Sequence, residues 1–383
     1  MFRVPKEKIG RLVTDAGDIG GWRSALECVA PDLPLNLETA ALLMRAAMSD
    51  EAAFVAIIES AGRMRDTVWG RSVKLFVPVY ISNACVNECL YCAYRAPNLA
   101  MSRRSLDPDE FRREIVEVTS MGYRVIELVT SESPALKENG ALARYLSTAR
   151  DVVECAAGVG KQEAEIILMS WALSEEEFES VRRGGLEAFY LWQETYDEVR
   201  FRDLHPQGTP KARFEDRIEV FDRAIGSGIR KVGMGVLFGL SDWRYDVLAL
   251  ISHGRYLEET YGVSPDAIGV PRFKHAEGAP MQVAPCAVSD DELRVAVAIY
   301  RLAFPRSHVF LNTREKLPLM LKLLDGGGSE MNIACAVYPG GYTHPSRERQ
   351  FDHYSYPTEK TLALLAGKGY RPTHYENREA VRH

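Results

Sequence analysis

The segment from Asp107 to Thr130 decides the fold class. It reads DPDEFRREIVEVTSMG over residues 107–122 and, after two further residues, VIELVT over 125–130. The first part has apolar residues at helical spacing and ends in Gly122, the residue type that a helix C-cap favours. The second part is a short, mostly apolar run, which is typical of a strand buried on both faces. The two parts predict a helix followed by a strand of a parallel sheet.

The same alternation recurs along the chain. Strand-like runs are VKLFVPVYI (73–81), VIELVT (125–130), EAEIILM (163–169), AFYLWQE (188–194), KVGMGVLF (231–238), AIGVPRF (267–273), VFLNTRE (309–315) and MNIACAV (331–337). Helix-like stretches lie between them, and several end in glycine (Gly122, Gly185, Gly228 and Gly367). Eight strands alternating with helices predict an α/β fold of the (β/α)8 TIM-barrel type.

The strand pattern also predicts the domain organisation. We expect an N-terminal helical extension over residues 1–70 and a barrel over 71–345. A C-terminal helical and loop tail that packs on the barrel is expected over 346–383. No low-complexity linker separates these parts.

Composition limits the classes of function. The 383 residues are 46% hydrophobic and carry a net charge of −6, with dispersed Lys and Arg. This composition argues against a nucleic-acid or anionic-membrane partner. We see neither the apolar core of a secretory signal in MFRVPKEKIG nor a run of 18 apolar residues. The seven unevenly spaced cysteines do not resemble a disulfide framework, so a cytoplasmic location is expected.

Three of the seven cysteines lie within eight residues. The stretch CVNECLYC places Cys85, Cys89 and Cys92 at C-x3-C-x2-C spacing. A structural zinc site usually has four ligands in two pairs. A [4Fe–4S] cluster held by three thiolates would keep one iron open for a reacting ligand. A zinc site with a distant fourth ligand and a fully ligated electron-transfer cluster remain alternatives.

The residues around the three cysteines carry a family resemblance. The stretch VYISNACVNECLYCAYR resembles the cluster loop of radical S-adenosylmethionine (radical SAM) enzymes. PVYISN before it and YRAPN after it are similar to the aromatic amino acid lyases, which include tyrosine lyases of thiamine synthesis and [FeFe]-hydrogenase maturation and a tryptophan lyase. The similarity covers roughly residues 75–345. It implies that a [4Fe–4S] cluster on Cys85, Cys89 and Cys92 binds S-adenosylmethionine.

The resemblance implies further contacts to S-adenosylmethionine. Tyr91 occupies the place of an aromatic residue near adenine, and Glu132 that of a Glu near the amino group. Ser131 stands where the family has Gly. Glu194 matches a residue near the ribose and methionine part, and Arg217 matches an Arg that pairs with the carboxylate. A solvated helical face is the alternative for Arg217.

Arg314, in the segment NTRE, matches the residue that binds the substrate carboxylate in these lyases. A surface pair with Glu315 is its alternative. Ala334 stands where the lyases usually have Ser, so the substrate pose is expected to differ, and nearby Cys335 is either a cavity residue or a small buried hydrophobe. No residue is assigned a catalytic role.

The resemblance implies radical cleavage or rearrangement of a carbon–carbon bond of a free amino acid, most simply tyrosine or tryptophan. A flavodoxin or ferredoxin would supply electrons. No cysteine follows Cys335, so we expect the C-terminal auxiliary cluster of the hydrogenase-maturation lyase to be lacking. The alternatives are an amino acid mutase of the methylornithine synthase type, a non-catalytic iron–sulfur scaffold and a zinc-binding structural module.

Overall fold

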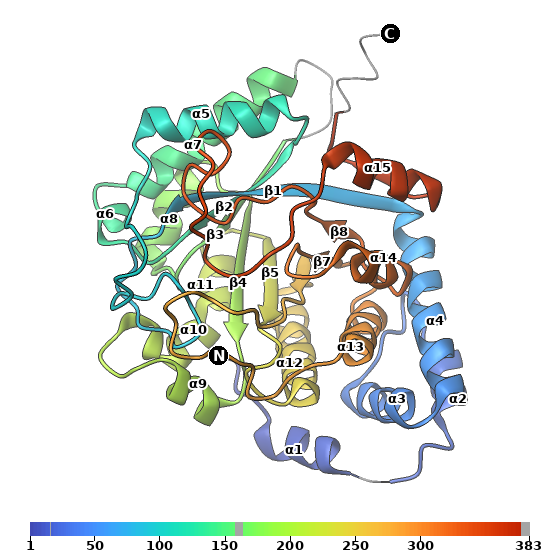
Figure 1. Cartoon of the computed structure of the whole chain (residues 1–383). Coiled ribbons are helices and arrows are strands. Elements are labelled where there is room, and N and C mark those ends of the chain that lie inside the picture. The colour runs from blue at the N-terminus through green and yellow to red at the C-terminus, as the bar shows by residue number, and fades with distance from the viewer. Residues whose placement is uncertain (16, 158–163, 377–383) are drawn as a thin grey trace.

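Eight parallel strands close into a barrel in the computed structural model, which describes residues 1–15, 17–157 and 164–376 (Figure 1). Each strand pairs with the next in the chain, and β1 pairs with both β2 and β8, which closes the ring. The strands are β1 Ser72–Ser82, β2 Val125–Thr130, β3 Glu165–Met169, β4 Ala188–Glu194, β5 Lys231–Val236, β6 Ala267–Gly269, β7 His308–Leu311 and β8 Glu330–Met331, with a further strand β9 Arg371–Thr373. The predicted TIM-type barrel is confirmed.

Helices surround the barrel and extend it at the N-terminus. They are α1 Lys6–Thr14, α2 Trp22–Glu27, α3 Leu37–Ser49, α4 Glu51–Trp69, α5 Pro108–Ser120, α6 Pro134–Lys137, α7 Ala141–Ala157, α8 Glu175–Arg183, α9 Glu198–Leu204, α10 Phe214–Ile218, α11 Val220–Gly226, α12 Trp243–Tyr261, α13 Asp290–Ala303, α14 Leu317–Asp325 and α15 Thr358–Gly367, with a 3₁₀ turn at Pro210–Ala212. Helices α3 and α4 pack against the barrel helix α13, as Figure 1 shows. The domain division at residues 70 and 345 stays a prediction, and residues 377–383 of the expected tail lie outside the described residues.

The segment that predicts the fold begins with a complete helix cap. Asp107 accepts a hydrogen bond from the Glu110 backbone N–H, and the Glu110 carboxylate accepts one from the Asp107 N–H. This capping box, with Pro108 in the first turn, fixes the start of α5. Gly122, at φ +104°, turns the chain after the helix toward β2.

Three details differ from the sequence prediction. The last barrel strand covers only Glu330 and Met331, and the Asn332 side chain that follows accepts a hydrogen bond from the Thr313 backbone N–H at 2.9 Å. Gly367 lies inside α15, and Gly369, at φ +77°, follows the helix instead. The tail also contributes β9, which pairs with the start of β1 and was not predicted.

Charged groups fill the barrel at the N-terminal ends of the strands. The ammonium of Lys74 lies 2.6 Å from a Glu165 carboxylate oxygen and 3.2 Å from one of Glu330. Lys231 lies 2.8 Å from the other Glu165 oxygen. Burial alone would raise the pKa of Glu165, but the two lysines outweigh it and lower that pKa to about 2. We call Lys74, Glu165, Lys231, Asp266 and Glu330 the barrel floor.

The Trp192 ring occupies the barrel interior above the floor. A Cβ at Gly235 or Gly269 would come within 2.5 Å of this ring. Both glycines therefore make room for Trp192, which gives Gly235 a packing role. The ring contacts Phe310 edge to face at a centroid distance of 5.4 Å. Trp192 and Phe310 form the base of the cavity described next.

Candidate active site

A cavity of about 200 Å³ opens at the C-terminal ends of the barrel strands. This is the end at which TIM-barrel enzymes place their active sites. All nine side chains that the sequence singled out line it: Cys85, Cys89, Tyr91, Cys92, Ser131, Glu132, Glu194, Arg217 and Arg314. The structure brings these residues together from five separate segments, while their individual roles stay predictions.

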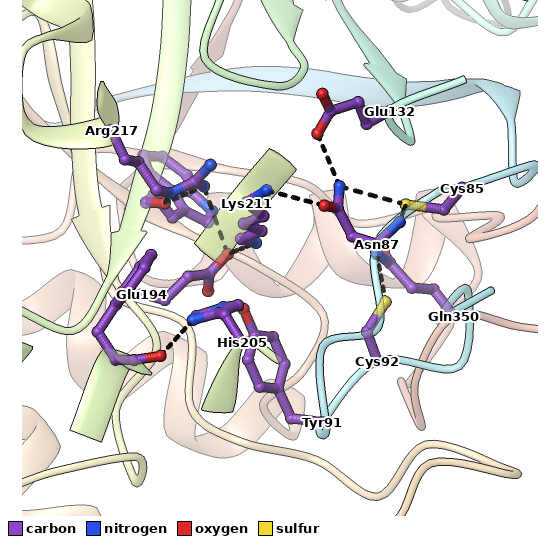
Figure 2. A network of polar contacts seen from close by, with 12 residues as sticks. Cys85, Asn87, Tyr91, Cys92, Glu132, Glu194, His205, Lys211, Arg217 and Gln350 are labelled. Atoms are coloured by element: carbon purple, nitrogen blue, oxygen red, sulfur yellow. Dashed lines mark hydrogen bonds and ion pairs between the residues drawn. The ribbon is translucent and has the colours of Figure 1, made fainter. Parts of the chain in front are cut away.

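The three thiols line one wall of the cavity and receive hydrogen bonds. The Asn87 backbone N–H donates to the Cys85 sulfur at 3.4 Å, and the Gln350 side-chain amide donates to the Cys92 sulfur at 3.6 Å (Figure 2). Burial raises the pKa of the Cys89 thiol to about 12, and the Lys211 ammonium acts in the opposite direction. Such buried thiols become thiolates when a cationic group binds them. Hydrogen bonds to sulfur are also a feature of iron–sulfur sites.

The described residues contain no group of three or more His, Cys, Asp or Glu side chains placed to hold a single metal ion. A [4Fe–4S] cluster bound by three cysteines would take each thiolate on a different iron, so its ligands need not converge on one point.

A chain of polar contacts links the cysteine loop to the opposite wall (Figure 2). The Asn87 side-chain Nδ2 donates to a Glu132 carboxylate oxygen at 2.7 Å. The Asn87 side-chain Oδ1 accepts a hydrogen bond from the Lys211 backbone N–H at 2.9 Å. The Lys211 ammonium lies 2.6 Å from Glu194, while Lys137 lies 2.6 Å from Glu132. Asn87 thus links the cysteine loop directly to Glu132 and, by way of Lys211, to Glu194.

Glu194 lies in a β-bulge at the end of β4, which places its carboxylate beside Lys211. Two residues of β4, Gln193 and Glu194, oppose Val236 of β5, and Glu194 adopts φ +73°. A non-glycine residue in this region carries backbone strain, which in folded proteins gathers at functional sites. Burial raises the pKa of Glu194, but Lys211 and Arg217 outweigh it, so the net pKa is lowered and the carboxylate stays ionised.

Arg217 is buried, so the solvated-face alternative is wrong. Its Nε donates to the Trp192 carbonyl at 3.0 Å, and a terminal nitrogen lies 3.5 Å from Glu194. The structure places it beside Glu194 and Trp192 on the cavity wall.

Tyr91 is fixed by a buried histidine. The His205 Nδ1–H donates to the Phe201 carbonyl at 2.7 Å, which leaves Nε2 to accept the Tyr91 hydroxyl at 2.9 Å. Burial lowers the pKa of His205 to about 3, so the ring is neutral in this arrangement. His205 therefore positions Tyr91, a role that the sequence analysis did not assign.

Arg314 has no carboxylate partner among the described residues. Its expected alternative partner, Glu315, pairs with Arg272 instead, where Nε lies 2.9 Å from a carboxylate oxygen. The Phe351 ring stacks on Arg314, with the guanidinium carbon 3.3 Å from the ring centroid. Within the described residues, the guanidinium makes one hydrogen bond, a 3.5 Å contact to the Arg272 carbonyl. The surface-pair alternative is wrong, and most of the guanidinium donors have no partner in that part of the chain.

Several cavity residues were missed by the sequence analysis. Asn87 lies between the cysteines and Lys211 six residues before Arg217, so both were polar residues beside recognised motifs. Gln350 and Phe351 come from the predicted tail and carry no local signal. Gln350 also accepts a hydrogen bond from the Tyr80 hydroxyl at 2.9 Å, which ties this segment to β1.

Comparison with known proteins defines the class. A family model described as the radical SAM superfamily matches residues 79–251. With the barrel and the three thiols in its mouth, this match shows that the chain carries a radical SAM domain. Members of the superfamily use a [4Fe–4S] cluster and S-adenosylmethionine.

Individual relatives narrow the comparison. The chain is 29% identical to the 2-iminoacetate synthase of Escherichia coli K12, over 82% of this chain and 81% of the relative. It is 24% identical to the 3-methylornithine synthase of Methanosarcina acetivorans, over 84% and 86%. Among solved structures, HydG, a maturase of the [FeFe]-hydrogenase, is similar with a TM-score of 0.88 and 28% identity, over 97% of this chain and 80% of that one.

The residues of the cavity fit both a [4Fe–4S] cluster and S-adenosylmethionine. Three thiols share one wall, and N–H donors point at two of the sulfurs. The Ser131 hydroxyl oxygen, on the cavity wall, is buried and makes no hydrogen bond within the described residues. A buried polar atom of this kind needs a partner, which a bound ligand would supply.

No helix in the described ranges is both long and apolar enough to cross a membrane.

Proposed function

We propose that this radical SAM protein cleaves or rearranges a carbon–carbon bond of a free amino acid, and that the amino acid is aromatic. One observation carries the proposal. Arg314 presents a guanidinium, without a counter-ion among the described residues, to the same cavity that holds the three thiols. Such a group binds a carboxylate in a bidentate manner. An amino acid carboxylate bound there would share the cavity with the predicted S-adenosylmethionine site.

The side chains of this cavity would position the reactants. Cys85, Cys89 and Cys92 would hold the [4Fe–4S] cluster, which when bound supplies the electron that cleaves S-adenosylmethionine to a 5′-deoxyadenosyl radical. Tyr91, Ser131, Glu132, Glu194 and Arg217 are proposed to contact S-adenosylmethionine. Phe351 and Gln350, from the C-terminal part of the chain, also line the cavity. They would help to exclude water, which protects a reactive radical from side reactions.

The remaining parts of the proposal follow from the class. A reductant is required, and a flavodoxin or ferredoxin in the cytoplasm is proposed to supply the electrons. Carbon–carbon lyase activity on tyrosine or tryptophan is favoured by the similarity to 2-iminoacetate synthase and HydG. A rearranging mutase is the second candidate, because 3-methylornithine synthase is also similar.

The test is anaerobic. The cluster is reconstituted, S-adenosylmethionine and dithionite are added, and 5′-deoxyadenosine is measured with tyrosine, tryptophan, lysine or no amino acid. A rise with tyrosine or tryptophan, with a cleaved or rearranged co-product, supports the proposal. Stimulation by lysine alone would favour the mutase. No 5′-deoxyadenosine from a fully loaded protein would favour a non-catalytic scaffold.

A matched pair of arginine variants isolates the carboxylate site. Arg314→Met should abolish stimulation by the amino acid while leaving the slow formation of 5′-deoxyadenosine without substrate. Arg244→Met removes an exposed guanidinium that pairs with Asp242 at the start of α12, and should leave both rates unchanged. Equal stimulation in Arg314→Met and in the unaltered protein would contradict the assignment of Arg314.

A further inference from the structure

A buried carboxyl group without a partner lines the deeper part of this cavity. Glu127, on β2, is 4% exposed. Its Oε1 atom is buried and makes no hydrogen bond within the described residues. The side chain nevertheless belongs to the cavity lining, with Val129 of the same strand and Pro78 and Met169 of the neighbouring strands β1 and β3. An orphaned acceptor in an apolar wall is costly and requires an explanation.

The floor of the same barrel shows how a buried carboxyl group is otherwise accommodated. Glu165 pairs with two lysines at 2.6 and 2.8 Å. No ion pair joins Glu127 to a lysine or arginine in the described part of the chain. Burial and, to a smaller extent, the nearby Glu330 carboxylate raise the pKa of Glu127 to about 8. A neutral carboxyl group in this state can both accept and donate a hydrogen bond.

The position of Glu127 sets its distance from the cavity rim. It lies three residues before Thr130, the last residue of β2, and therefore about 10 Å below the strand end. Arg314 follows the end of β7 at the rim. Glu127, Arg314 and the Cys335 thiol all line the same cavity. A ligand bound at Arg314 therefore shares one cavity with the Glu127 carboxyl group.

We propose that Glu127 determines substrate specificity by hydrogen-bonding an O–H or N–H donor on the ring of an aromatic amino acid whose carboxylate is bound at Arg314. This inference rests on the proposed function and names the side-chain class of its substrate. Tyrosine carries such a donor on its phenol, and tryptophan on its indole. Phenylalanine has the ring without the donor.

The walls around Glu127 favour a flat ring over a flexible ammonium chain. Trp192 and Phe310 meet edge to face at the base, and Val129 and Met169 complete an apolar slot. Aromatic surfaces of this kind stabilise a bound ring by stacking and edge contacts. The neutral state of Glu127 also suits a neutral donor, because a lysine ammonium would require the carboxyl group to ionise in apolar surroundings.

The experiment measures ligand affinity on reconstituted protein saturated with S-adenosylmethionine and without reductant. Calorimetric titrations compare tyrosine with phenylalanine, tryptophan with 1-methyltryptophan, and lysine. The proteins are the unaltered chain, Glu127→Leu and the control Met169→Leu, which changes the adjacent wall residue with little change in volume. Circular dichroism and iron content verify that each variant is folded and loaded.

We expect the unaltered protein to bind tyrosine or tryptophan at least about tenfold more tightly than its donor-free analogue. Glu127→Leu should reduce that ratio to near one, whereas Met169→Leu should preserve it. The arm that shows the larger ratio identifies phenol or indole as the donor.

Three outcomes would overturn the inference. They are an unchanged ratio in Glu127→Leu, no discrimination by the unaltered protein, and tight Glu127-dependent binding of lysine alone. Failure of the proposed function looks different, since 5′-deoxyadenosine would then form from the loaded protein without stimulation by any of these amino acids.

Discussion

The buried ionisable side chains at the two ends of the barrel differ in whether they have charged partners. At the floor, Lys74 and Lys231 pair with Glu165, and Lys74 also contacts Glu330. At the cavity, Glu132 and Glu194 pair with lysines, but Glu127 and Arg314 have no charged partner in the described chain. Paired charges satisfy one another, while unpaired ones remain available to a ligand. The comparison therefore sets the paired groups of the floor, which stabilise the fold, against two unpaired groups at the cavity that are open to a ligand.

The largest effect is expected at the thiols of the cavity. Cys89→Ser should lower cluster content and reduce 5′-deoxyadenosine formation by at least about 100-fold, since even outer-sphere changes at metal sites cost 10- to 100-fold. Cys28→Ser, at an exposed cysteine, is the control and should behave like the unaltered protein. Iron analysis and anaerobic turnover measure both. Full activity in Cys89→Ser would mean that the Cys89 thiol is not needed for cluster binding or catalysis.

The floor should show its effect in stability. Lys74→Met leaves Glu165 and Glu330 without their shared ammonium, and should reduce the free energy of unfolding by about 3–5 kcal/mol at pH 7. Lys8→Met disrupts an exposed pair with Glu38 and should change it by less than about 1 kcal/mol. Urea unfolding compares the two. Equal small losses would mean that the floor pairs do not stabilise the barrel.

Glu127 should act on stability in a pH-dependent way. Its pKa is raised to about 8, so the folded state keeps a proton that the unfolded chain releases above about pH 4.3. The stability linked to this group is full below pH 4.3 and falls as the pH rises to 8. Glu127→Gln lacks this loss, and its stability relative to the unaltered protein should grow by about 1–3 kcal/mol between pH 5 and pH 8. If the free energies of unfolding of the two proteins stayed a constant distance apart across that pH range, the pKa of Glu127 would not be raised in the folded state.

The smallest effect concerns backbone strain at the cavity. Glu194 adopts φ +73°, a backbone conformation that is unstrained for glycine and strained for glutamine. Glu194→Gly should therefore be about 1 kcal/mol more stable than Glu194→Gln, although both lack the carboxylate. Chemical denaturation of the two variants isolates the backbone contribution. Equal stability would mean that the bulge in β4 carries no strain.

Much of the fold was predictable because each strand has a local signature. The run VIELVT matches β2 and AFYLWQE matches β4 residue for residue. The prediction was too long at β8, which covers two residues and is followed by Asn332, whose side chain accepts a hydrogen bond from the distant Thr313 backbone N–H. Tertiary contacts of this kind leave no periodic trace in the sequence.

The site was predictable to the extent that its residues belong to motifs. Gln350 was missed because its neighbours give no sign that the chain returns to the cysteines. Glu127 had a visible signal, since it interrupts an otherwise apolar strand run, as Lys74 does in β1. The sequence could not show that one of these charges is paired and the other is not.

The cavity wall also has a consequence for the timing of assembly. The Gln350 amide and the Cys92 sulfur that it contacts are separated by 258 residues. At ordinary translation rates, Gln350 is synthesised roughly 10 to 50 s after Cys92. During that interval the cysteine loop exists on the ribosome without part of its protective wall. The complete wall around Cys92 therefore exists only after the chain has been synthesised past residue 350.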